Sequence, residues 1–228
     1  MNTVQHKKST NMARSNKTTR EQRLRSGSQD RREQERQELR QLMLDAAGAL
    51  FLERGYAGFS LRQVAEQIGY SPGTIYLYFR DKDDLLFHVA DTGFRLFQEQ
   101  QQRAALSASE PQARLQAVAQ AYVRFGLAYP AYYRLMFVER PDLLFKEHAD
   151  EAAAWLATLD AYQQLFQELS AGAASPAQVQ ALADVWWATV HGIVMLANSM
   201  GVVFDQARID AMLAAALAQI MRALGREA

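Results

Sequence analysis

The sequence predicts an all-α protein, in which a small N-terminal helix-turn-helix domain is followed by a bundle of longer helices. Three observations lead to this prediction. Three helix starts lie close together between Ser60 and Leu86, long alanine-rich segments with apolar faces follow Leu86, and no segment alternates in the manner of a strand. We expect residues 31–86 to form the first domain and residues 87–228 the second, with residues 1–30 as a separate arm.

Composition sets the outer limits of the interpretation. The chain has 228 residues, which is enough for a sizeable core, either as one domain with a small accessory or as two. It contains no cysteine, so disulfides, thiolate chemistry and cysteine zinc sites are excluded. No repeat with a period of about 20 to 50 residues is evident.

The arm at residues 1–30 is polar and basic. The first 27 residues hold seven Lys or Arg and a single acid, Glu21, while the whole chain has a net charge of zero. With almost no apolar side chains this segment cannot bury a core, so we expect it to be disordered when it is not bound to DNA. It also lacks the apolar stretch of a secretory signal, which favours a cytoplasmic protein.

The helices of the first domain can be placed in order from their capping residues. An amphipathic helix is expected from Arg31 to Gly55, and the next starts at Ser60, whose spacing to Gln63 is that of a capping box. Gly69 supplies the left-handed residue that ends this short helix. Ser71 followed by Pro72 starts the middle helix, and Asp81 caps the third start. Two short helices joined by a glycine-containing turn form a helix-turn-helix.

The middle helix has an unusual distribution of side chains. At about 100° per residue, Ile75 and Phe79 share the core side, and Leu77 points away from it. Tyr76 and Tyr78 project to opposite sides. This pattern is typical of a helix that lies in a major groove, with small groups at its floor and hydroxyl groups at the phosphate walls. The alternative is that both tyrosines are ordinary half-buried aromatics.

The run from Phe51 to Leu86 resembles the N-terminal DNA-binding domain of the tetracycline-repressor (TetR/AcrR) family. The marks that carry the resemblance are Gly55, Ala65 with Gly69, the run Gly73-Thr74-Ile75-Tyr76, the pair Tyr78-Phe79, and Lys82 before Leu85-Leu86. The resemblance implies a homodimeric, all-helical transcription regulator whose C-terminal domain binds an effector. It also implies that Thr74, Tyr76, Tyr78 and Lys82 contact DNA, mainly phosphates. Tyr70 departs from the small aliphatic residue of the family turn, and Tyr78 from its common histidine.

Together, face geometry and the resemblance give a set of candidate DNA-binding residues: Arg62, Ser71, Gly73, Thr74, Tyr76, Leu77, Tyr78 and Lys82. For Lys82 the alternative is a solvated surface charge, and Arg62 is a candidate for either a backbone or a base contact. The basic arm could follow the duplex through Arg20, Arg23 or Arg25. Its alternative is a solubilising leader or an over-long start of the chain.

The second domain is expected to contain only helices. They should run from Lys82 to about Leu106, from Pro111 to near Tyr129, over a short element at residues 131–137, from about Phe145 to Leu169, from Ser175-Pro176 to about Met200, and from Asp205 to Leu224. Residues 185–204 carry no charge, but the polar residues within that run favour a buried helix over a membrane span. By the resemblance, the last two helices form the homodimer interface, where Ala211, Ala214, Ala215 and Ala218 allow close approach.

Aromatic side chains of the second domain are candidates for an effector pocket, which would favour a hydrophobic ligand. The candidates are Tyr122, Phe125, Trp155, Tyr162, Phe166, Trp187, His191 and Met195. Each could instead be a core residue, and His191 a satisfied buried histidine.

Enzyme functions find little support in the sequence. It has neither a glycine-rich phosphate loop with Lys-Ser/Thr nor a serine nucleophile elbow, and we expect no cofactor. The cluster Glu147, His148 and Glu151 is interpreted as a solvated face and not as a metal site. The prediction is a ligand-responsive regulator, most simply a repressor that a small effector releases from a palindromic operator. The alternative is a helical scaffold protein that keeps the fold without recognising an operator.

Overall fold

A computed structural model describes residues 3–140 and 153–225, with side chains from residue 29 to 140 and from 160 to 225. Over these ranges the chain forms helices joined by turns and has no strand. The predicted all-α class is therefore confirmed.

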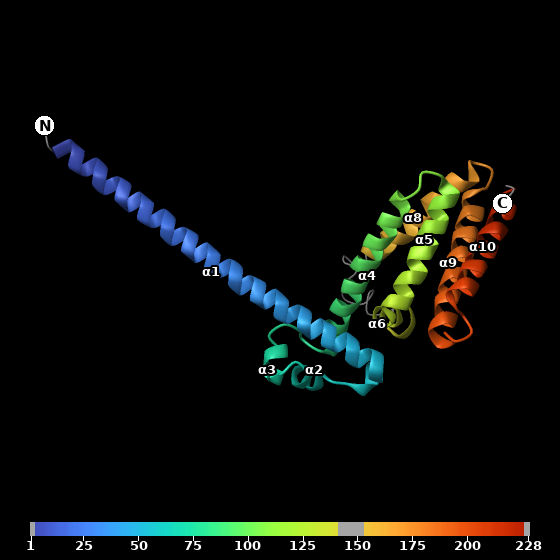
Figure 1. Cartoon of the computed structure of the whole chain (residues 1–228), viewed down its shortest axis with the longest axis horizontal. Helices are drawn as coiled ribbons and strands as arrows, with labels where there is room; N and C mark the ends of the chain where they lie inside the picture. The colour runs from blue at the N-terminus through green and yellow to red at the C-terminus, as the bar shows by residue number, and fades with distance from the viewer. Residues whose placement is uncertain (1–2, 141–152, 226–228) are drawn as a thin grey trace.

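Helix α1 spans Thr3–Arg54, 52 residues in all, and is the longest element. Its last turns pack against the other helices of the first domain, while its N-terminal part projects away from the rest of the molecule (Figure 1). The expectation of a disordered arm at residues 1–30 is corrected, because the backbone from Thr3 onward continues α1. The segment has no proline, and its Arg, Lys and Gln residues have high helix propensity. A polar composition that cannot bury a core is therefore compatible with a helical backbone.

The rest of the first domain lies against the C-terminal turns of α1 (Figure 1). It consists of η1 (Tyr56–Gly58), α2 (Leu61–Gln67) and α3 (Pro72–Ile75). The apolar side chains that face α1 are buried, and Met43, Ala47, Phe51, Val64, Ala65, Ile75 and Phe79 are at most 1% exposed. Elements as short as α2 and α3 are not stable alone, so this shared core holds them in place.

Helix α4 (Lys82–Leu106) leaves the first domain and runs beside α5 (Pro111–Ala128) in the second. The bounds of both helices agree with those expected from the sequence. Helix α6 (Pro130–Arg134) and a π-helical turn, η2 (Leu135–Glu139), then bring the chain back toward the first domain. Gly93 of α4 allows this segment to pack closely, because a Cβ there would lie 2.7 Å from Met136 Sδ and 2.9 Å from Tyr132 Cβ.

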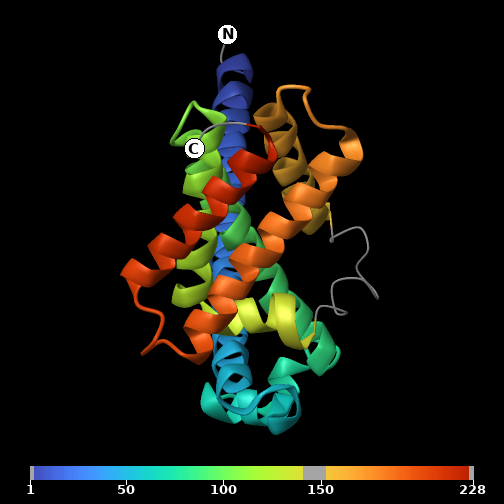
Figure 2. The same ribbon diagram turned by 90° about the vertical axis from the view of Figure 1, so that its right-hand side faces the viewer.

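Helices α8 (Ala153–Ser170), α9 (Pro176–Ser199) and α10 (Gln206–Ala223) complete the second domain. The predicted caps are present: Ser175 forms a full capping box with Gln178, and the Asp205 side chain accepts from Arg208 N. Figure 2 shows α9 and α10 side by side on the face opposite the projecting end of α1. The expected start of α8 near Phe145 lies outside the described residues.

Neither of the two expected domain boundaries lies in a loop between helices. Residue 30 lies within α1 and residue 86 within α4, so α4 belongs to both parts. The buried side chains of the two parts form one continuous core.

Helix α9 is the single described helix whose length and hydropathy would allow it to cross a membrane, which is weak evidence by itself. In the structure α9 packs against α5, α8 and α10. Its buried residues include Val179, Trp186, Val190 and Val194.

Candidate functional site

The helix-turn-helix is held by local hydrogen bonds that the sequence pattern predicted. Ser60 N donates to Gln63 Oε1 at 2.9 Å, and Gln63 N donates to Ser60 Oγ at 3.4 Å, which completes the capping box of α2. Gly69 has φ of 76°, a conformation that favours glycine, and Tyr70 N donates to Ala65 O at 2.9 Å. This turn fixes the direction in which α3 leaves α2.

Helix α3 presents the faces that its sequence predicted. Ile75 and Phe79 are 0% and 1% exposed, whereas Tyr76 and Leu77 are 60% and 77% exposed. The helix ends at Ile75, but Phe79 N still donates to Ile75 O at 3.0 Å, so the next turn continues on the same axis. A large apolar side chain that is as exposed as Leu77 either contacts another molecule or is tolerated at the surface as a single apolar residue.

Small and polar groups surround Leu77. Gly73 is exposed, and a Cβ there would meet only Ser71 Oγ, at an ordinary 3.7 Å. Ser71 occupies the N-cap position, but its hydroxyl forms a 2.9 Å hydrogen bond with Thr74 Oγ1 instead of capping the helix. This pair still has one hydroxyl proton to donate outward, as a phosphate contact requires. Arg62 is exposed on α2 and pairs with Glu66 at 2.9 Å.

Lys82 differs from its expected role. Its Nζ donates to Phe59 O at 2.6 Å and also to Tyr56 O. It lies 4.3 Å from the centroid of the Phe59 ring, and burial lowers the pKa of its amine. Tyr56 begins η1 and Phe59 directly follows it, and carbonyls at the end of a short helix need donors from outside the helix, which the ammonium group supplies. The position of Lys82 therefore does not support the predicted phosphate contact.

Other side chains beside α3 were not among the sequence candidates. Arg36 of α1 lies over the Tyr78 ring, 5.8 Å from its centroid, and Arg40 lies 5.4 Å from the centroid of Phe79. Tyr70 is 45% exposed immediately before α3. The i, i+4 spacing of the two arginines on the amphipathic first helix could have suggested a shared basic face, but not its contact with Tyr78.

A polar junction connects the first domain to the segment that follows α6. Asp83, in the first turn of α4, accepts from Tyr56 Oη at 2.6 Å and from Arg140 at 3.1 and 3.2 Å. The hydrogen bond to Asp83 raises the pKa of Tyr56. At the end of α6, Arg134 donates to Leu52 O at 3.2 Å. The segment from α6 to Arg140 therefore contacts the end of α1 as well as the start of α4.

The aromatic residues of the second domain form a connected cluster. The Tyr133 hydroxyl lies 2.5 Å from His191 Nδ1, and Trp187 stacks on the His191 ring with a centroid distance of 5.5 Å. Burial raises the pKa of Tyr133 and lowers that of His191, so this hydrogen bond joins two uncharged side chains at neutral pH. Tyr122 and Phe137 pack against Tyr133.

Most of the predicted effector residues therefore serve the core. Tyr122, Phe125, Tyr162 and Phe166 are buried, while Trp187, His191 and Met195 are partly buried. The side chain of Trp155 and the cluster Glu147, His148 and Glu151 lie outside the described residues. A separate cavity of about 260 Å³ lies between α4, α5 and α8, and Tyr162 is the one predicted effector residue among those that line it. Within the described ranges, no group of three or more His, Asp or Glu side chains could hold a metal ion.

Comparison with known proteins gives two family matches in the order of the two structural parts. Residues 43–89 match the model described as bacterial regulatory proteins of the tetR family, and residues 115–220 match the tetracyclin repressor-like C-terminal domain. The transcriptional regulator AcrR of Shigella flexneri is 43% identical over 56 residues, which cover 25% of this chain. That match spans about a quarter of the regulator's own length (26%).

Solved structures with a similar fold cover most of the chain. A protein with unknown function from Rhodococcus sp. RHA1 is 32% identical, with a TM-score of 0.67, over 82% of this chain and 96% of that one. AibR, solved in complex with isovaleryl coenzyme A and operator DNA, has the same fold at 19% identity, with a TM-score of 0.64, over 79% of this chain and 96% of AibR.

The first match covers the helix-turn-helix together with the buried anchors of α3, and the second covers the helices from α5 to α10. The resemblance seen between Phe51 and Leu86 is thereby confirmed and extended over the second domain. The chain belongs to the tetR family of bacterial regulatory proteins.

Proposed function

We propose that the chain is a sequence-specific repressor that binds a palindromic duplex operator as a homodimer and leaves it when a small molecule binds the second domain. The observation that carries the proposal is the exposed face of α3, where Leu77 and Tyr76 stand open while Ile75 and Phe79 anchor the helix. The cytoplasm, where such an operator lies, is the proposed location.

The proposed DNA contacts divide into two kinds. Gly73, Thr74 and Leu77 face the groove floor, where Leu77 can pack on a thymine methyl group. Tyr76 and the Ser71 hydroxyl reach phosphates, and Arg36 adds a positive charge on the side of Tyr78. Apolar contact carries limited base information, so phosphates should contribute much of the affinity.

Dimerisation through α9 and α10 supplies the second half-site contact. The open face of α10 is a stripe of exposed alanines, among them Ala207, Ala211, Ala214 and Ala215. On α9, Val185 is 58% exposed, and a Cβ on Gly192 would meet nothing within 4 Å. This apolar surface supports a helical interface with a second copy, which would remove it from water.

The response to ligand rests on the segment α6–η2. Tyr133 and Phe137 of this segment pack on His191, and Arg134 and Arg140 hold the first domain at Leu52 and Asp83. A ligand that favours another arrangement of the second domain shifts the population of these contacts, and with it the spacing of the two α3 helices. Two half-sites at a fixed separation penalise a changed spacing. AibR, which has the same fold, is solved in complex with both isovaleryl coenzyme A and operator DNA, and this supports the presence of a ligand site and a DNA site in one chain.

The test is a binding titration of the full chain against a palindromic fragment from its own promoter region. We expect Leu77→Ala and Tyr76→Ala to lower operator affinity at least about tenfold while the melting temperature stays the same, because both side chains are exposed. Leu106→Ala is the matched control, since Leu106 is 87% exposed at the far end of α4. Binding no tighter than to random duplex, or variants that bind as well as the wild type, would favour the scaffold alternative.

A further inference from the structure

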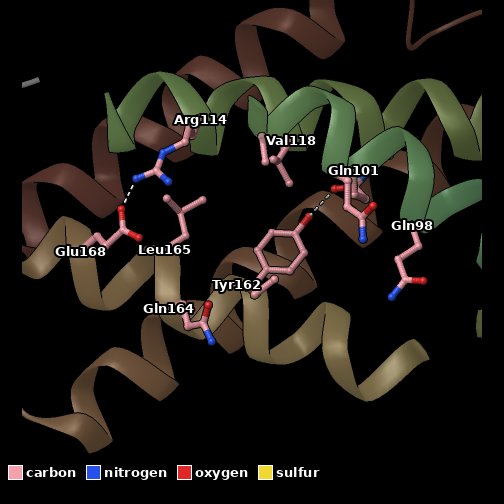
Figure 3. A pocket seen from close by; sticks show the side chains of 11 residues that line it. Gln98, Gln101, Arg114, Val118, Tyr162, Gln164, Leu165 and Glu168 are labelled. Carbon is pink, nitrogen blue, oxygen red and sulfur yellow. Dashed lines mark hydrogen bonds and ion pairs between the residues drawn. The ribbon is translucent and has the colours of Figure 1, made fainter. Parts of the chain in front are cut away.

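The cavity between α4, α5 and α8 has a polar end and an apolar middle (Figure 3). Arg114 of α5 and Glu168 of α8 face each other at one end, and Gln98 of α4 lies at the other. Between them stand Val118, Leu165 and the ring of Tyr162. The cavity therefore resembles a ligand site in kind, with a mostly apolar wall and a few placed polar groups.

Arg114 is the cation in this lining, and its hydrogen bonding is incomplete. One terminal nitrogen, Nη2, forms an ion pair with Glu168. The Nε atom is buried and has no hydrogen-bond partner among the described residues. A buried N–H without an acceptor is unfavourable, and Nε with Nη2 forms the edge of a guanidinium that a planar carboxylate or a phosphate can engage with two oxygens.

Glu168 is a replaceable partner for this guanidinium. Its side chain is 48% exposed, against 26% for Arg114. An ion pair with one partner half in water contributes little to stability, so another anion can displace Glu168 at small cost. An anion that also accepts from Nε would make one hydrogen bond more than Glu168 does.

We infer that this cavity binds an amphipathic anion, whose carboxylate or phosphate pairs with Arg114 and whose apolar body covers Tyr162, Val118 and Leu165. The inference deepens the proposed ligand response and rests on it for its biological meaning. Helix α4 contributes Gln98 and also Gln101, whose amide lies 3.3 Å from the Tyr162 hydroxyl. The same helix begins with the Asp81 cap and the Asp83 junction beside the first domain, so a ligand here touches the connecting element directly.

Calorimetric titration of the full chain, without DNA, tests the inference with three probes that share one acyl chain. Octanoate offers a carboxylate, octanoyl-CoA offers phosphates, and octanamide is neutral. We expect at least one of the two anions to bind about tenfold or more tightly than octanamide, and the one that does identifies the source of the charge. Equal binding of octanamide and the anions, or no binding of either anion, would overturn the inference.

Two substitutions separate ligand binding from a structural role of the ion pair. Arg114→Gln should abolish the preference for the anion. Glu168→Gln should strengthen anion binding several-fold because Arg114 then has no internal carboxylate, whereas a purely structural pair would lower affinity or leave it unchanged in both variants. Arg95→Gln, at a side chain that is 75% exposed and pairs with Asp91 on α4, is the matched control and should leave the anion preference unchanged. Operator binding by the ligand-free chain is measured separately, so failure of the anion site leaves the proposed repressor function standing.

Discussion

At the scale of single residues, the surroundings of Lys82 decide what its charge can do. Its ammonium group lies among the carbonyls of Tyr56 and Phe59 and against their rings. Hydrogen bonds from a charged donor to buried acceptors are among the stronger ones in proteins. The residue joins the loop after α1 to the start of α4, and its contribution is to the position of the helix-turn-helix.

Replacement of Lys82 by methionine should therefore destabilise the fold more than it weakens DNA binding. We expect the free energy of unfolding to fall by about 2 kcal/mol, since two carbonyls are then without a charged donor. Urea denaturation measures this change. The slope of log operator affinity against log salt should stay unchanged, whereas removal of a phosphate-binding cation would reduce it by about 0.9. Arg62→Met, at a side chain that is 77% exposed, is the control and should alter stability by no more than about 0.5 kcal/mol.

The residues of α3 were predictable and those around Lys82 were not, for a physical reason. The sides to which Ile75, Phe79 and Leu77 point follow from the helical repeat alone. The contacts of Lys82 and Arg36 depend on where η1 and α1 lie in space, which spacing along the chain does not specify. For the same reason the aromatic cluster at His191 was recognisable as a group, while the cavity at Arg114, made by three helices, was not.

At the scale of elements, helix ends were the most predictable feature. Ser60, Asp81, Ser175 and Asp205 each cap the helix that the sequence assigned to them, because a cap is a local arrangement of three or four residues. The predicted conformation of the N-terminal arm was wrong. Its composition argues against a hydrophobic core, but a helix can form without contributing to a core. Whether its charges contact DNA remains a separate prediction.

Deletion of residues 1–27 tests the role of this projecting part of α1. The melting temperature should not change, because the segment extends away from the packed body (Figure 1). Operator affinity should become less dependent on salt, by about 0.9 in the log–log slope for each phosphate that the protein no longer neutralises. A full-length variant with Gln at the seven basic positions of this segment is the control for length, and it should behave like the deletion. An unchanged slope in both would identify the segment as a leader.

At the scale of the whole molecule, the second domain has a packed side and an open side. Helix α10 buries Ile209, Leu213 and Leu217 against the rest of the domain, while Ala211, Ala214 and others of its alanines are exposed. Small outward side chains contribute little to the stability of a single chain. Because these side chains are small, they allow a helix of another chain to approach α10 closely.

A charge placed on this open side should separate the proposed dimer. Ala214→Glu leaves the core of one chain untouched, since Ala214 is exposed, but buries a carboxylate in the interface. We expect a monomer by sedimentation analysis and an operator affinity reduced at least about a hundredfold, because each half-site is then bound alone. Ala113→Glu, exposed in the first turn of α5, is the matched control and should remain dimeric. A dimer of wild-type affinity in the Ala214 variant would place the interface elsewhere.

The length of α1 also affects how closely such proteins can sit on a chromosome. From Thr3 to Asp30 the helix extends about 42 Å at 1.5 Å per residue, which is comparable to about 12 base pairs of duplex. If these helices lie along the DNA, each bound molecule occupies the flanks of its operator as well as the palindrome itself. Neighbouring binding sites in a promoter would then exclude one another over that distance, so a polymerase or a second regulator would meet the protein well outside the sequence that α3 reads.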